Sequence, residues 1–389
     1  MAFLNLFRNR KKTIITVISI CLGMILVNVF YTFSNSFNVD RMVNSYIYAD
    51  FLVADKSYLD FAVPYVNQTN TLKESYIDEI ASLPGVKDVA SVYYRCDDKT
   101  SVSVKPRINY SMLYGIDEYW YDIIDDSLVE GTLDRTKFNS GKYIIITIDD
   151  GTNISVGDTV TTNGKNYEVM GKVSYEKLYS LSTRYSAINS FSGLLPKNEV
   201  LSKTDSDLMS LSVFAEKGDI NRLEENLKTY LASLNSNIEY ISRDSYKDDI
   251  VHNNSQFTVV GLCISMIILF IGIINFINSS MTGIISRRYE FSVLNAIGMT
   301  SKQLRLMLIS ESLIFTLGTA LIFIPLGSLF SYLIIGVMLK ENYSFVFNFD
   351  LFPMFCILLI FVIISVILPL GIYRTISKKS AIQRNYDAE

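Results

Sequence analysis

Four long apolar runs constrain the fold of this chain more than any other feature of its sequence. They cover residues 13–34, 257–284, 306–337 and 351–373 of the 389. A helix needs about 20 apolar residues to cross the hydrocarbon core of a bilayer, and each run meets that length with almost no charge. We therefore expect four transmembrane helices. The first run is too long for a signal peptide and lacks a small-x-small cleavage site, which favours a retained anchor.

Lys and Arg residues gather on one side of these runs. They stand before the first run, between the second and the third, and after the fourth: Arg8, Arg10, Lys11, Lys12, Arg287, Arg288, Lys302, Arg305, Arg374, Lys378, Lys379 and Arg384. The segment 38–255 instead holds 22 basic and 33 acidic residues. The positive-inside rule places the cationic side in the cytoplasm. We expect cytoplasmic segments at 1–12, 285–305 and 374–389, and external segments at 38–255 and 338–350.

The external segment 38–255 has the pattern of an α+β domain. Residues 46–54 and 141–148 are rich in β-branched and aromatic side chains, as strands are. Residues 73–83 and 219–234 have the apolar spacing of amphipathic helices. Strand-like segments accompany these two helices, at 86–94 for the first and at 208–216 and 237–242 for the second. Two such units separated by a β-rich insert predict a split domain.

The insert "NISVGDTVTTNGKNYEVMGKVS" (153–174) predicts a small β-barrel or sandwich. Gly157-Asp158 and Asn163-Gly164 are turn dipeptides that stand between alternating strands.

Signals of enzyme chemistry are poor. The chain has one histidine, His252, so a metal cluster or a His-based catalytic triad lacks parts, and we expect His252 to be a solvated residue. The segments 141–143 (GKY) and 164–166 (GKN) lack the upstream glycines of a phosphate-binding loop. We expect no catalytic residue, no metal and no directly bound cofactor. If ATP drives this protein, a separate chain must hydrolyse it.

An aromatic cluster stands out in the external segment, in "NYSMLYGIDEYWYDII" (109–124). One interpretation is a hydrophobic core with partly exposed tyrosines. The other is a surface for an external partner, because Tyr and Trp are enriched at interfaces. The residues concerned are Tyr110, Tyr114, Tyr119, Trp120 and Tyr121.

A few polar groups lie within the apolar runs. Glu311 comes about 9 Å of helix rise after Arg305, and a carboxylate in hydrocarbon needs a partner. It predicts either a structural ion pair or a role at a vestibule. Asn275 and Asn278 add polar groups near the inner end of the second run. In the third run, Gly318 and Gly327 would permit close packing.

The stretch between the second and third runs, "RRYEFSVLNAIGMTSKQL" (287–304), predicts a helical hairpin. Tyr289, Val293, Ala296 and Ile297 share one helical face. Gly298 fits the C′ position, where a left-handed residue ends a helix. Thr300-x-x-Gln303 is a capping box that begins the next helix. The apolar face predicts either a connector on the lipid surface or a docking element for a cytoplasmic protein.

Five segments, in this order, resemble the FtsX-like/MacB-type (type VII) ABC transporter permeases. "SRRYEFSVLNAIGMTSKQLRLMLISESLIF" is similar to the segment between their second and third spans, and "NLFRNRKKTIITVISICLGMILV" to their first-span signature. The others resemble their extracytoplasmic core domain: "LPGVKDV", "LYGIDEYWYDIIDDSLVEG" and "ISVGDTVTTNGKNYEVMGKV".

The resemblance implies an α+β multi-pass protein of the bacterial cell membrane, with four transmembrane helices and a MacB-like core domain between helices 1 and 2. It implies a dimer with a second permease half, identical or different, and a cytoplasmic ABC ATPase that binds ATP. The residues that match the family's ATPase-coupling motif are Arg287, Arg288, Glu290, Leu294, Gly298, Thr300 and Gln303. The fused N-terminal ATPase of some members is absent from this sequence, which could also correspond to half of a longer permease.

Two functions follow from the resemblance. In the first, the chain is an exporter subunit that acts on a peptide, an antibiotic or a lipid-linked substrate. In the alternative, it is a non-transporting mechanotransmission or signalling subunit that controls a cell-wall hydrolase or a sensor kinase. A solitary membrane anchor would leave the charged hairpin unexplained.

Overall fold

The computed structural model describes residues 10–60, 71–97, 100–102, 110–148, 154–162, 164–182, 190–202, 207–234, 236–340 and 342–386. The expected cationic residue Arg8 and the turn residue Asn163 lie outside these ranges. The chain divides into two compact units, one formed by residues up to Asn38 and from His252 onward, the other by Val39–Val251. We refer to them as the helical unit and the sheet unit.

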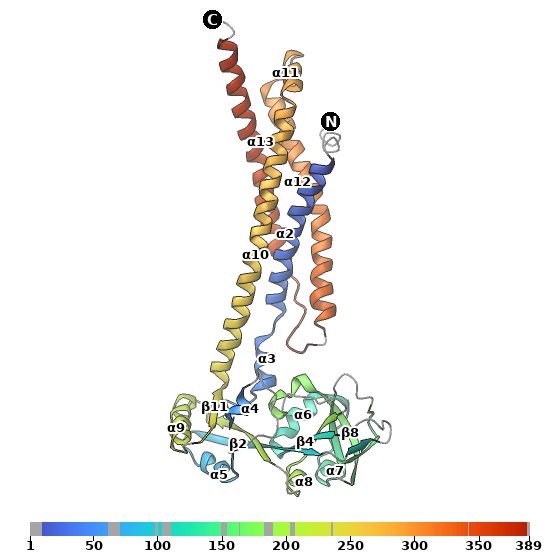
Figure 1. The fold of residues 1–389 in the computed structure, drawn as a ribbon, viewed down its shortest axis with the longest axis vertical. Helices are drawn as coiled ribbons and strands as arrows, with labels where there is room; N and C mark the ends of the chain where they lie inside the picture. The colour runs from blue at the N-terminus through green and yellow to red at the C-terminus, as the bar shows by residue number, and fades with distance from the viewer. Residues whose placement is uncertain are drawn as a thin grey trace. The chain divides into compact units, whose positions relative to one another are not determined.

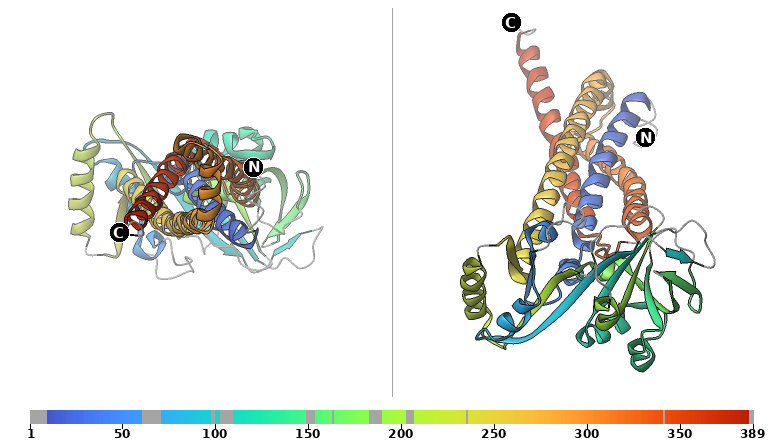
Figure 2. Two further views of the ribbon diagram at one scale, coloured as in Figure 1. Left: turned by 90° about the horizontal axis from the view of Figure 1, so that it is seen from above. Right: turned by 60° about the horizontal axis from the view of Figure 1, so that its bottom comes forward.

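Four helices in the described residues are long and apolar enough to cross a membrane. They are α2 (Arg10–Ser36), α10 (Arg243–Ser286), α12 (Ser301–Ser331) with its continuation η4 (Tyr332–Met338), and α13 (Phe352–Tyr386). In the helical unit they run side by side (Figures 1 and 2). The short helix α11 (Arg288–Ala296) lies between α10 and α12. The third expected span is not α-helical throughout, because η4 is a π-helix.

The four helices pack through an apolar core and a few polar contacts. Ile20, Met24, Leu269, Phe323 and Phe361 are among the buried side chains of that core. Hydrogen bonds also link neighbouring helices: Asn28 Nδ2 donates to Ser331 Oγ, Asn275 Nδ2 donates to Ser19 Oγ, and Thr316 and Ser365 share a bond between their hydroxyls. Each such bond satisfies polar groups that hydrocarbon would leave unpaired.

The sheet unit is built on one sheet, to which 11 strands in the described residues belong. The strands are β1 (Phe51–Asp55), β2 (Val86–Asp97), β3 (Thr100–Val102), β4 (Tyr110–Ile116), β5 (Leu128–Gly131), β6 (Tyr143–Ile148), β7 (Thr159–Thr162), β8 (Lys165–Ser174), β9 (Ser190–Pro196), β10 (Asp207–Ala215) and β11 (Ile238–Ser242). Their order is β11-β1-β10-β2-β4-β9-β6-β8-β7-β3, and β5 pairs with β8. Most pairs are antiparallel, but β4–β9 and β6–β8 are parallel.

Short helices accompany the sheet. They are α3 (Val39–Tyr46), α4 (Lys56–Leu59), α5 (Ser75–Ala81), α6 (Tyr121–Ser127), α7 (Arg135–Asn139), α8 (Lys197–Leu201) and α9 (Ile220–Ser233), with 3-10 turns η1 (Glu118–Trp120), η2 (Tyr175–Lys177) and η3 (Tyr179–Leu181). Helix α9 lies at one end of the sheet beside β11 (Figure 2). Its buried residues Leu223, Leu227 and Leu231 come from the predicted apolar stripe.

Two expectations for this unit were wrong. The segment 46–54 is not one strand, because Tyr46 ends helix α3 and the strand begins only at Phe51. The described residues of the insert 153–174 do not close into a separate barrel or sandwich. Their strands β7 and β8 join the common sheet, in which β8 pairs with β6 in parallel. The two predicted halves do meet, since β10 pairs with β2 along most of its length.

Candidate functional site

The hairpin between α10 and α12 has the local structure that its sequence predicts. Helix α11 ends in a Schellman motif, in which Met299 N–H donates to the Leu294 carbonyl at 3.0 Å and Gly298 N–H to that of Asn295 at 3.1 Å. Gly298 has a φ of 107°, which a side chain would disfavour. Thr300 and Gln303 form the expected capping box at the start of α12. The helix stop and the new start are therefore confirmed.

One face of α11 packs against the helical unit. Phe291 is buried in a cluster with Ile284, Leu304 and Leu308, and Leu294 packs partly buried against it. Phe291 was not predicted as a buried residue, because α11 carries apolar residues on more than one face. Leu294 follows Phe291 by three residues and therefore lies on the same helical face. This spacing is the sequence pattern from which the buried face could have been predicted.

The opposite face of α11 is apolar and exposed. Tyr289 is 79% exposed and Ile297 is 78% exposed, with Val293 between them. These three residues, which we call the α11 face, are a turn apart along the helix and so form one stripe. Arg288 and Gln303 are exposed nearby. The α11 face is the part of the hairpin that is free to meet another surface.

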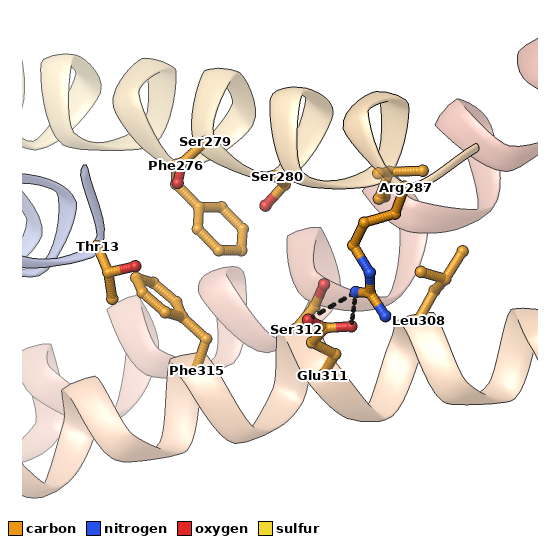
Figure 3. A pocket seen from close by; sticks show the side chains of 11 residues that line it. Thr13, Phe276, Ser279, Ser280, Arg287, Leu308, Glu311, Ser312 and Phe315 are labelled. Atoms are coloured by element: carbon orange, nitrogen blue, oxygen red, sulfur yellow. Dashed lines mark hydrogen bonds and ion pairs between the residues drawn. The ribbon is translucent and has the colours of Figure 1, made fainter. Parts of the chain in front are cut away.

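Arg287 lies at the break between α10 and α11, and its guanidinium is turned into the helical unit (Figure 3). Its Nη1 donates to both carboxylate oxygens of Glu311, at 3.0 and 2.8 Å, and its Nε donates to Glu290 Oε2 at 3.1 Å. The guanidinium also lies over the Phe291 ring, 5.2 Å from its centroid. Burial opposes the charge, but the hydrogen bonds and negative charges of Glu311 and Glu290 together outweigh it and raise the pKa of Arg287 above its ordinary value. Glu311 therefore has an ion-pair partner, which is Arg287 rather than a cation on its own helix.

A cavity of about 100 Å³ lies beside this ion pair. Hydroxyl groups of Thr13, Ser279, Ser280 and Ser312 are among the groups that line it (Figure 3). Asn275 and Asn278 do not line it. Asn275 contacts Ser19 on α2, and Asn278 is exposed. The structure thus does not bring the three polar residues expected inside the membrane to one place.

The aromatic cluster of the sheet unit is mostly core. Tyr114, Trp120 and Tyr121 are buried, while the side chain of Tyr110 lies outside the described residues. Tyr119 is 36% exposed and packs on Phe214, with ring centroids 4.4 Å apart. Of the proposed external surface, only Tyr119 among the described side chains reaches the solvent. In the described ranges, no group of three or more His, Cys, Asp or Glu side chains could hold a metal ion.

Two family models match the chain, and together they cover most of it. The MacB-like periplasmic core domain matches residues 13–229, and the FtsX-like permease C-terminal domain matches residues 262–381. No curated protein matched the chain.

Among solved structures, the periplasmic region of MacB from Actinobacillus actinomycetemcomitans is similar, with 19% identity, coverage of 51% of this chain and 91% of that one, and a TM-score of 0.38. The extracellular domain of the noncanonic ABC-type transporter YknZ from Gram-positive bacteria is also similar. It has 17% identity, coverage of 44% and 89%, and a TM-score of 0.31.

Proposed function

Because the chain belongs to the family of FtsX-like permeases with a MacB-like periplasmic core domain, we propose that it transmits ATP-driven motion from a cytoplasmic ABC ATPase to its sheet unit. The motion serves the export or removal of a peptide, an antibiotic or a lipid-linked substrate. In this proposal the chain binds no cofactor itself, and ATP is bound and hydrolysed by the ATPase.

The α11 face carries this proposal. The apolar surfaces of Tyr289 and Ile297 are in contact with water. Burying them against a partner would stabilise the complex by about 25 cal/mol per Å² of apolar surface. The C-terminal end of their helix is fixed by the Schellman motif and by the capping box that follows it, so the face is ordered before it binds. A rigid surface loses little conformational entropy on docking.

The charge distribution supports the orientation. Lys and Arg flank the spans on the side of the hairpin, and residues 38–255 are acidic. The hairpin and both chain ends then lie in the cytoplasm, where ATP is available, and the sheet unit lies outside. A second permease half, identical or different, completes the transporter in the plasma membrane.

The docking step can be tested with the double variant Tyr289→Ser/Ile297→Ser. Both side chains are exposed, so the hairpin keeps its fold while the α11 face loses its apolar area. We expect the affinity for the ABC ATPase that co-purifies with the full chain to fall by about tenfold or more, because two central apolar side chains of an interface often supply more than 1 kcal/mol each. Binding is measured with the purified ATPase and the full chain in lipid nanodiscs.

Val129→Ser is the matched control, since Val129 is an exposed apolar residue of the sheet unit. It should bind the ATPase like the unaltered chain. Equal affinity of the double variant and this control would refute the docking role of the α11 face.

A further inference from the structure

Helix α11 is attached to the helical unit at few points. A break at Arg287 separates it from α10, and the turn at Gly298 separates it from α12. Nothing lies within 4 Å of the position that a Cβ on Gly298 would take. A force on the α11 face would therefore tilt this helix about its two ends, unless side chains hold it.

Two sets of side chains do hold it. The first is the apolar cluster of Phe291 and Leu294 with Leu304 and Leu308. Apolar packing has no preferred direction, and on α12 these contacts lie within about the first two turns, while other members of the cluster come from α10 and α13. The second is the ion pair between Arg287 and Glu311, which reaches further, because Glu311 lies about 15 Å along α12 from Ser301.

Arg287 meets three helices at once. Its backbone N–H donates to the carbonyl of Ile284 on α10 at 3.2 Å. Its side chain contacts Glu290 and Phe291 on α11 and both carboxylate oxygens of Glu311 on α12. Its side chain is 10% exposed and that of Glu311 is 18% exposed. The two carboxylates that Arg287 contacts, Glu290 and Glu311, therefore belong to different helices.

The ion pair resists separation more than an exposed pair does. Parting two charges that are this shielded from water would leave each one without its partner in a poorly solvated place. A movement of α11 therefore costs less free energy if α12 moves with it, because the ion pair then stays intact. The hydroxyl-lined cavity beside Glu311 gives the pair space in which to shift without leaving polar surroundings.

We infer that Arg287 is a positioning residue that carries the movement of α11 into α12 through its ion pair with Glu311. This inference rests on the function proposed above. It assigns different tasks to two parts of the hairpin, since the α11 face binds the ATPase and the Arg287–Glu311 pair passes on the movement.

The test uses the full chain in nanodiscs with the purified ATPase and compares Glu311→Gln, Glu311→Arg and the charge-swapped Arg287→Glu/Glu311→Arg. Two quantities are measured. The first is the dissociation constant for the ATPase, which reports docking. The second is the change in backbone hydrogen exchange that ATP causes in α11 and, separately, in α12.

We expect docking to stay within about twofold in all three variants, because none alters the α11 face. In Glu311→Gln and Glu311→Arg, the ATP-dependent change should persist in α11 and fall about fivefold or more in α12, in the range of usual coupling effects. The charge-swapped variant should restore at least part of the change in α12. Lys56→Gln, which removes an exposed ion pair with Glu239 in the sheet unit, is the control and should change nothing.

The outcomes separate the two proposals. A purely structural role for the pair would speed exchange in α12 with and without ATP alike, and that result overturns the inference. So does an unaltered ATP response of α12 in Glu311→Arg, or a failure of the charge swap to restore it while Glu311→Gln shows the loss. If the unaltered chain binds no ATPase, the proposed function fails, and the inference fails with it.

Discussion

At the scale of single residues, glycines decide how closely α2 and α10 approach. A Cβ built on Gly23 would lie 2.6 Å from the Leu269 Cα and 2.7 Å from its backbone nitrogen. Gly272 is tight in the same way, with the Ile20 Cα and nitrogen each at 3.1 Å. In both cases the atoms that an added Cβ would meet belong to the backbone of the other helix, which cannot move as a flexible side chain can. The two helices would have to separate to admit a methyl group.

We therefore predict that Gly23→Ala destabilises the helical unit by about 1–3 kcal/mol, the usual result of overpacking. The measurement is thermal unfolding of the full chain in detergent, followed by the helical circular dichroism signal. Gly318→Ala is the matched control, because nothing lies within 4 Å of its Cβ position. It should be neutral or slightly stabilising, since alanine favours helix. Equal unfolding temperatures for the two variants would contradict the close contact.

The same glycines show what sequence can and cannot predict at this scale. The sequence indicated close packing at Gly318 and Gly327, but only Gly327 is tight, against the Cε of Met354 on α13. Likewise, the sequence predicted a partner for Glu311 and could not name Arg287 as that partner. Both contacts depend on which helix lies opposite, and that is set by packing of distant segments rather than by local spacing.

At the scale of elements, the turn between α11 and α12 could be predicted in full from its local sequence. The glycine stop, the capping box and the start of α12 depend on neighbours within five positions, so local chemistry determines them. The π-helix η4, in contrast, could not be predicted from the sequence. Its residues are apolar like those of α12 before it, so their pattern does not distinguish a π-helix from an α-helix. The buried face of α11 was also missed, because its partners lie on α12 and α13.

We predict that Gly298→Ala loosens this turn. At a φ of 107° a side chain costs about 1–2 kcal/mol, and the free space around Gly298 means that the penalty is conformational and not steric. Exchange of the Met299 amide, which donates to Leu294, should quicken by roughly tenfold. Gly298→Asn is the control and should have a smaller effect, because Asn tolerates positive φ better. If Ala and Asn behave alike, the left-handed conformation does not limit the turn.

At the scale of the whole molecule, composition and charge were enough to predict the broad plan. Four apolar helices and an intervening α+β domain are present, and the family models agree. The order of strands was not predictable. Parallel pairs such as β4–β9 join residues about 80 positions apart in the sequence, and such long-range pairing leaves no local pattern. The insert therefore looked like a separate barrel, although its strands extend the common sheet.

The sheet unit has two cores of its own. One cluster of buried residues includes Trp120, Phe138 and Tyr114, and the other includes Phe51, Leu223 and Phe191. Helix α3 contributes Val43 to the first core, the residue after it contributes Ile47, and the first turns of α10 contribute Tyr246. They are also joined by polar contacts, since Arg243 Nη1 donates to the Ile47 carbonyl at 2.7 Å and Lys247 Nζ lies 2.8 Å from Asp40 Oδ1. The unit should therefore need both of these segments but not the apolar helices.

We predict that a fragment of residues 39–251 folds alone and unfolds cooperatively, whereas a fragment of residues 51–242 melts about 10 °C lower. The shorter fragment loses several buried side chains, among them Val43, Ile47 and Tyr246, at about 1.5 kcal/mol or more for each of these three. A domain of this size loses about 2–4 °C per kcal/mol. Thermal unfolding of both fragments in detergent-free buffer checks this. A longer fragment without a cooperative transition would mean that the sheet unit depends on the helical unit for its fold. Equal melting temperatures would instead mean that α3 and the start of α10 are attached to the core without stabilising it.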